Sequence, residues 1–156
     1  MILSPSQQSR LEHQHESIDE MINDRSETSL TTRPETGKWS TFENIAHLAA
    51  YQPAFLERLK KMETEESPLF ERYVAEKDPK FYEYGKMNLQ QVRELLTMHR
   101  LLLINHISPL DESILRRSGR HPVYGNLAIP QWVEFFLLHE AHHLFTIFKL
   151  LNAQGH

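Results

Sequence analysis

The chain contains no cysteine, little glycine and no long apolar run. Without cysteine it can form no disulfide, no thiolate-ligated metal site and no cysteine nucleophile. Five glycines in 156 residues argue against a fold of many strands and tight turns, and so favour helices. The longest apolar runs, Leu101 to Ile104 and Phe135 to Leu138, are far shorter than the roughly 20 residues that cross a bilayer.

A strong charge of one sign is also missing. The net charge is −4, and no run of like charges forms a tail, so nothing indicates a general affinity for nucleic acid. The first 21 residues lack the basic and apolar regions of a secretory signal. We therefore expect a cytoplasmic protein without nucleic-acid or membrane partners, folded as one domain over residues 1–156.

Helical periodicity is present in four segments. In the first, Leu11, His15, Ile18 and Ile22 recur at helical spacing. The second opens with the capping-box pattern Ser40 to Glu43, and the fourth opens with Pro130, a residue suited to the first helical turn. No alternating strand pattern of useful length is present. The expected helices cover about residues 5–29, 40–62, 88–107 and 130–152.

The connections after the second and third helices are long, at residues 63–87 and 108–129. Long loops in a small domain are usually functional segments or crossovers. The pattern predicts an all-α four-helix bundle with at least one long crossover connection.

Histidine is unusually abundant, with 10 residues. His139 and His143 lie four residues apart on the same helical stripe as Trp132, Phe136 and Ile147, so both should face the interior. In a chain of this composition about 0.6 such pairs arise by chance. Two core histidines satisfied by hydrogen bonds are therefore the alternative to a metal site.

His47 lies on the matching interior stripe of the second helix, beside Leu48 and Tyr51. Buried neutral imidazoles need partners, and a metal ion satisfies several acceptor nitrogens at once. His47, His139 and His143 therefore predict an open site for a divalent metal. Zinc is the first choice, with nickel, manganese or iron as alternatives, and free positions remain for water or substrate.

His139 to His143 also match H-E-x-x-H, the helix motif of zinc proteases. Those enzymes take a further ligand well downstream, and only 13 residues follow His143. We set the protease reading aside. On the same helix His142 should be peripheral, and Glu140 should be a solvated surface carboxylate.

Three motifs resemble those of the DinB superfamily. Trp39 to Leu48 resembles its W-S-x-x-E-x-x-x-H-L signature, His121 to Leu127 its H-P-x-x-G-x-L loop, and His139 to His143 its H-x-x-x-H helix. The resemblance implies a four-helix bundle with the crossover between helices 2 and 3, a three-histidine metal site on His47, His139 and His143, and a homodimer. Characterised relatives include thiol-dependent S-transferases and a mycothiol-dependent maleylpyruvate isomerase, and others are described as metal-dependent hydrolases.

Further residues are expected around the metal. Glu43, one turn before His47, either orients that imidazole or only closes the capping box. Asn44, Tyr51, Gln52 and Tyr124 are expected to line the open face and contact a small-molecule substrate.

Three functions remain open. The first is a metal-dependent transferase acting on small electrophiles, which needs an external low-molecular-weight thiol because the chain has no cysteine. The second is a metal-dependent hydrolase. The third is a noncatalytic module that binds metal or partners, for example in a stress response. A homodimer would cover Phe135, Leu138 and Phe145, which lie off the inward stripe.

Overall fold

The computed structural model describes residues 2–153, so residues 1 and 154–156 of the predicted domain lie outside the described residues. Its elements are α1 (Pro5–His13), η1 (Gln14–Glu16), α2 (Ser17–Ile22), α3 (Glu27–Thr31), α4 (Thr41–Thr64), η2 (Ala75–Lys77), α5 (Pro79–Tyr84), α6 (Leu89–Ile107), α7 (Glu112–Leu115), β1 (Ser118–His121), β2 (Gly125–Ala128) and α8 (Ile129–Ala153).

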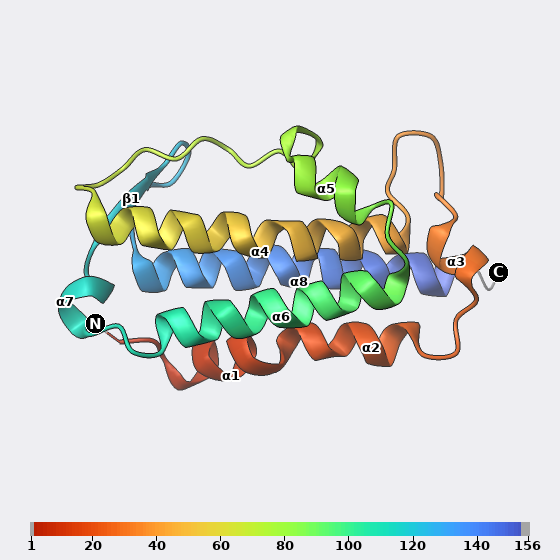
Figure 1. Ribbon diagram of the computed structural model, residues 1–156, viewed down its shortest axis with the longest axis horizontal. Helices are drawn as coiled ribbons and strands as arrows, with labels where there is room; N and C mark the ends of the chain where they lie inside the picture. The colour runs from red at the N-terminus through yellow and green to blue at the C-terminus, as the bar shows by residue number, and fades with distance from the viewer. Residues whose placement is uncertain (1, 154–156) are drawn as a thin grey trace.

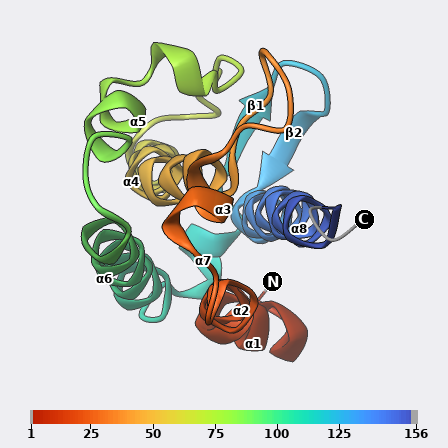
Figure 2. The ribbon, with the colours of Figure 1, turned by 90° about the vertical axis from the view of Figure 1, so that its right-hand side faces the viewer.

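The predicted four-helix bundle with its crossover is confirmed. Viewed down the bundle, α4 lies between α6 and α8, and α1 with α2 forms the fourth side (Figure 2). The helices α4 and α6 run in the same direction, so the chain returns between them along the outside of the bundle, carrying η2 and α5 (Figure 1). This crossover leaves one side of α4 under a loop rather than under another long helix.

The starts of α1, α4 and α6 follow from their caps. Ser4 with Gln7, Ser40 with Glu43 and Asn88 with Gln91 each form a complete capping box, which satisfies backbone N–H groups that the first helical turn leaves free. The predicted first helix is shorter than expected. It has a 3-10 turn at residues 14–16 and ends at Ile22, because Asn23 is extended and Asp24 has a φ of 60°.

The bundle also contains one short pair of strands, which no alternating pattern in the sequence predicted. Strands β1 and β2 form an antiparallel hairpin before α8. Each strand has only four residues, which is too short for an alternating pattern to stand out. Gly119 packs so closely here that a Cβ atom would lie 2.5 Å from Cε2 of Phe70. The hairpin is thereby fixed against the end of α4 and the first turn of α8.

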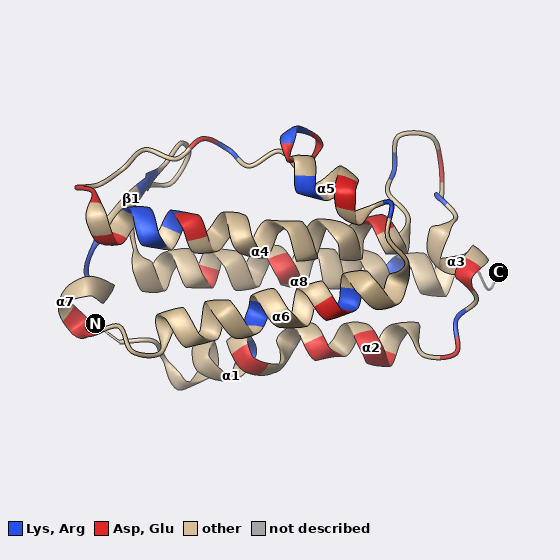
Figure 3. Ribbon diagram, in the orientation of Figure 1, with Lys and Arg blue, Asp and Glu red and all other residues tan. Residues whose placement is uncertain are grey.

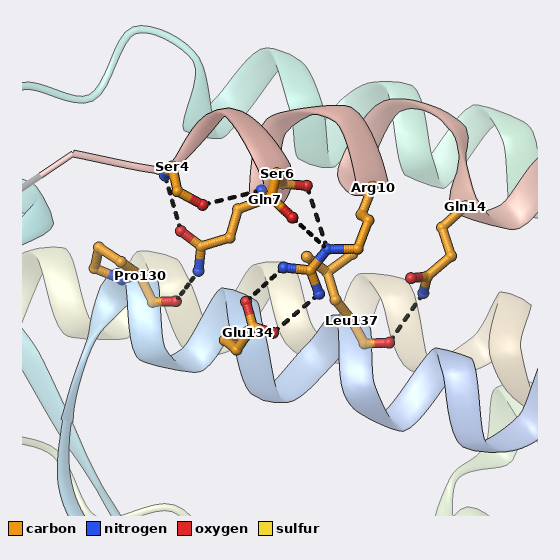
Figure 4. A network of polar contacts seen from close by, with 8 residues as sticks. All are labelled: Ser4, Ser6, Gln7, Arg10, Gln14, Pro130, Glu134 and Leu137. Carbon is orange, nitrogen blue, oxygen red and sulfur yellow. Dashed lines mark hydrogen bonds and ion pairs between the residues drawn. The ribbon is translucent and has the colours of Figure 1, made fainter.

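The buried core runs along the facing sides of α4 and α8. Much of α8 carries no charge (Figure 3), and its inward stripe contains the buried residues Trp132, Phe136 and Ile147. Polar contacts fasten α1 to α8 (Figure 4): Gln7 donates to the Pro130 carbonyl at 2.8 Å, and Arg10 pairs with both carboxylate oxygens of Glu134 at 2.9 and 2.8 Å. Within residues 2–153, no helix is long and apolar enough to cross a membrane.

Candidate metal centre

The three predicted histidines meet between α4 and α8. His47 comes from α4, and His139 and His143 come from successive turns of α8. One ring nitrogen from each lies within 4.8 Å of the other two. Nε2 of His47 and Nε2 of His139 are 3.1 Å apart. Two nitrogens bound to one tetrahedral zinc ion at about 2.0–2.1 Å lie about 3.3 Å from each other, so the observed spacing fits a shared ion.

Hydrogen bonds among the described residues satisfy this cluster only in part. Each neutral imidazole has one N–H and one acceptor nitrogen. A hydrogen bond between the two Nε2 atoms would still leave Nδ1 of His47 and Nδ1 of His139 buried without a hydrogen-bond partner among the described residues. If both rings carry their proton on Nδ1, the two Nε2 lone pairs face each other at 3.1 Å, and a cation between the rings would bind both. The donor set therefore suits a divalent metal.

The orientation of His143 is fixed by Asn44. The side-chain nitrogen of Asn44 donates to the Ser40 carbonyl at 2.8 Å, so its oxygen must face His143. That oxygen accepts from Nδ1 of His143 at 2.8 Å. The proton of His143 is thus on Nδ1, and the lone pair of Nε2 is left for a metal.

The three imidazoles are neutral at physiological pH. Burial first, and then the neighbouring histidines, lower the pKa of His47 to about 2. Burial, followed by His143, His142 and Arg58, lowers the pKa of His139 to about 3. Burial, followed by His142, lowers the pKa of His143 to about 4. Neutral imidazole is the form that binds metal.

Three residues expected around the metal have other roles. Glu43 accepts from the Ser40 N–H at 2.8 Å and from Arg33 Nε at 2.9 Å, so its carboxylate closes the capping box and pairs with arginine rather than orienting His47. Gln52 is buried and accepts from Arg100 Nε at 3.0 Å, pointing away from the histidines. Asn44, expected on the open face, is instead the buried partner of His143.

The expectation of a solvated Glu140 is wrong. Its side chain is 2% exposed and forms an ion pair with Arg100, whose own side chain is 1% exposed. Gln14 donates to the other carboxylate oxygen of Glu140 at 3.0 Å. Arg100 also donates to the Leu11 carbonyl at 2.9 Å, and its Nη1 lies 3.2 Å from Nδ1 of His15. A residue next to a histidine of the cluster thus belongs to a separate buried network.

The histidines lie at the floor of a cleft of about 810 Å³ between α4, α8, the crossover and the hairpin. Tyr51 and Tyr124 line it as expected, and the exposed His142 lies at its edge. Sequence reasoning missed Arg58, Arg72 and Tyr73, and it used Trp39 and His121 only as parts of motifs. Arg58 carried a signal, because it continues the α4 stripe of His47 and Tyr51 at helical spacing. Arg72 and Tyr73 come from the irregular crossover and carried none.

This geometry agrees with comparisons to known proteins. The family model described as the DinB superfamily matches residues 10–147. The chain belongs to the DinB superfamily. The resemblance of the three motifs is thereby confirmed.

Two similar proteins come from Oceanobacillus iheyensis and Bacillus subtilis. A protein of Oceanobacillus iheyensis named "Putative metal-dependent hydrolase" is 28% identical over 137 residues, covering 85% of this chain and 77% of the relative. YuaE of Bacillus subtilis, described as uncharacterized, is 30% identical over 131 residues, covering 76% and 81%.

A solved structure shares the fold. YfiT of Bacillus subtilis, described as a probable metal-dependent hydrolase with an unusual four-helix bundle topology, superposes with a TM-score of 0.78. Its sequence is 18% identical, and the match covers 96% of this chain and 86% of YfiT. At that identity the likeness supports the DinB-like bundle alone.

Proposed function

We propose that this DinB-superfamily protein is a metal-dependent hydrolase of small molecules. The observation that carries the proposal is the convergence of three neutral histidine nitrogens within 4.8 Å at the floor of an open cleft. Three protein nitrogens leave a divalent ion with free positions, as in catalytic zinc sites. The names of the Oceanobacillus relative and of YfiT point to the same reaction class.

His47, His139 and His143 would hold the ion, and Asn44 would keep the His143 ring in place. When bound, the metal supplies Lewis acidity, which polarises a carbonyl and lowers the pKa of water toward about 7. Zinc suits three imidazoles best, and nickel, manganese and iron are the alternatives.

Tyr51 is the residue placed to assist. Its ring centroid lies 4.5 Å from that of His139, and burial raises the pKa of its phenol, so the hydroxyl stays protonated. Among residues 2–153 this hydroxyl has no hydrogen-bond partner, whereas the Tyr73 hydroxyl donates to Asp78 at 2.7 Å. Tyr51 can therefore donate to an oxyanion or a leaving group.

Thiol transfer is the second candidate, and the size of the cleft favours it. A cleft of about 810 Å³ is near the upper end of small-molecule sites and has room for a thiol cofactor beside an electrophile. The thiol must come from outside, since the chain has no cysteine.

One assay separates the candidates. Metal-loaded protein is offered a panel of small esters and amides and a generic electrophile, with and without low-molecular-weight thiols. Metal-dependent hydrolysis without thiol, abolished in His139→Ala and retained in His142→Ala, would support the hydrolase. Turnover only with thiol would replace it by the transferase, and no metal-dependent turnover would leave a noncatalytic binding module.

We also propose that the protein forms a homodimer through α8. The hairpin covers Phe135, but Leu138, Phe145 and Phe148 remain 58%, 59% and 50% exposed, and a second copy would bury them. Light scattering should give twice 18.4 kDa. Phe145→Glu should give the monomer mass, and Met98→Glu, which changes an exposed residue of α6, should not. A monomer mass for the unchanged protein would refute the dimer.

A further inference from the structure

The cleft above the histidine cluster has a second polar end. On α4, Arg58 follows His47 by three helical turns, and its guanidinium carbon lies 5.6 Å from the ring centroid of Trp132 on α8. Trp132 precedes His139 by seven residues, or about 10 Å of helix. Arg58 lines the same cleft as the histidines, so the two ends are separated by about the length of a small molecule.

Arg58 has few partners for a half-buried cation. Its Nη2 atom donates to the Glu71 carbonyl at 2.8 Å, and the guanidinium packs over Phe70 and Trp132. Among residues 2–153 no carboxylate pairs with it. A guanidinium has five N–H donors, so most of those of Arg58 are left for a ligand. Arg100, the fully buried arginine, is by contrast paired with Glu140.

His121 provides a second donor at this end. Its Nδ1 accepts from the backbone N–H groups of Val123 and Tyr124, at 3.1 and 3.2 Å. The proton of the neutral ring is therefore on Nε2, which has no hydrogen-bond partner in the described part of the chain. Both groups pack against Trp132, because the His121 ring centroid and the Arg58 guanidinium carbon each lie 5.6 Å from a Trp132 ring centroid.

The charges of the cleft are unbalanced. Arg58 and Arg72 line it together with a single carboxylate, Glu76. A divalent ion on the histidines would add two further positive charges. A cleft of one sign with low-dielectric walls attracts ligands of the opposite sign. Between its ends the walls are aromatic, formed by Tyr51, Tyr73 and Phe135.

We propose that Arg58, assisted by Nε2 of His121, binds an oxyanion of the substrate at the end of the cleft away from the histidine cluster. The substrate class is then a small carboxylate or phosphate monoester whose reacting group is separated from the anion by an apolar, aromatic or alkyl spacer. Arginine suits this role because its fork binds either oxyanion through two N–H groups. The placement of a reacting group at the histidine end rests on the proposed hydrolase function. The anion site at Arg58 does not depend on that function.

Binding to metal-free protein tests the anion site without any turnover. The probes are 4-phenylbutyrate, 3-phenylpropyl phosphate and the uncharged 4-phenylbutan-1-ol, titrated by calorimetry at pH 7.5. At least one anionic probe should bind about tenfold or more tightly than the alcohol. Arg58→Gln should remove this preference, and Arg58→Lys should restore part of it. Lys60→Gln is the matched control, because it removes an exposed positive charge from the same helix, two residues away.

Equal binding of the charged and uncharged probes would overturn the proposal. So would an equal loss of affinity in Arg58→Gln and Lys60→Gln, since that would be a general charge effect. If Arg58 only holds the crossover through Glu71, Arg58→Gln should lower the melting temperature and weaken the binding of all three probes alike. That result would also overturn the proposal. A retained anion preference without any metal-dependent hydrolysis would refute the proposed function and leave the anion site standing.

Discussion

Two polar clusters lie inside the same apolar bundle, and they start from adjacent residues of α8. Glu140 belongs to a network with Arg100, Gln52, Gln14 and His15, in which the ion pair is surrounded by further hydrogen bonds. His139 belongs to the histidine cluster, which leaves two buried Nδ1 atoms without hydrogen-bond partners among the described residues. Both clusters are costly to bury, but only the first is satisfied by the chain itself.

The difference separates a structural role from a functional one. A satisfied network holds helices in register and needs nothing from outside. Three like nitrogens that lie within 4.8 Å of one another beside a cleft have instead the arrangement of a candidate ligand set. The contrast between residues 139 and 140 can be tested directly.

The largest effect on stability is expected at Glu140. Glu140→Ala leaves the Arg100 guanidinium buried without its counter-ion, and such a change costs about 3–5 kcal/mol. Urea unfolding should show this loss with or without metal. The double variant Arg100→Met with Glu140→Leu should recover most of it, because no buried charge remains. A loss below about 1 kcal/mol in Glu140→Ala would mean that the ion pair between α6 and α8 contributes little to the stability of the bundle.

The neighbouring change His139→Ala should act on metal binding instead. The metal content measured by elemental analysis should fall from about one divalent ion per chain to nearly none, because two nitrogens hold a divalent ion poorly. Metal-free His139→Ala should unfold at nearly the same urea concentration as the metal-free parent protein. His47→Ala and His143→Ala should behave alike, and His142→Ala should keep its metal. Loss of metal in His142→Ala with retention in His143→Ala would show that the wrong ring was assigned.

Asn44 should have a smaller effect on the same site. Asn44→Ala leaves the three ligands in place but frees the His143 ring, and loss of such a supporting contact typically weakens metal affinity about 10–100-fold. Competition with a chelator measures the affinity. Glu43→Gln is the control, because Glu43 lies next in the chain yet contacts Ser40 and Arg33. An equal weakening in both variants would place the effect in the helix cap rather than in the contact with His143.

The last expected effect is the pH dependence of metal-free stability. The folded pKa values of His47, His139 and His143 are lowered to about 2, 3 and 4, whereas an unfolded histidine titrates near ~6.5. Below pH 6.5 the unfolded chain therefore binds more protons, and stability should fall as the pH falls toward 4, by at least about 1 kcal/mol. Urea unfolding between pH 7 and pH 4.5 measures this.

His15 separates the two clusters in the same experiment. Burial first, and then Arg100, lower its pKa to about 4, so it contributes a dependence of the same sign. His15→Gln should remove one part of the slope and leave most of it. A variant with glutamine at all three histidines of the cluster should remove the larger part. If His15→Gln alone abolished the slope, the histidine cluster would not be buried and neutral in solution.

Much of the bundle could be predicted because its signals are local. The capping boxes at Ser40 and Asn88 and the apolar stripe of α8 define helices without knowledge of the fold. The hairpin was missed because strands of four residues carry too little pattern. The break after Ile22 depends on the backbone of Asp24, which residue type alone does not determine.

The site was predictable where it follows helical spacing. The His139 and His143 pair and His47 lie on interior stripes, and the structure brings them together. Glu140 could not be placed, because its burial requires Arg100, 40 residues earlier in the chain on another helix. Gln52 was assigned to the cleft for the same reason: its partner is this arginine. Long-range pairs of polar groups are invisible to periodicity.

The contact from Ser40 through Asn44 to His143 connects the cap of α4 with the candidate ligand set. The residue that caps the helix also provides the carbonyl that orients Asn44. By thermodynamic reciprocity, whatever favours a closed first turn of α4 also favours the bound state of the site, and an occupied site in turn holds that turn closed. Amide hydrogen exchange in the first turn of α4 should therefore report on metal occupancy, although none of those amides touches the ion.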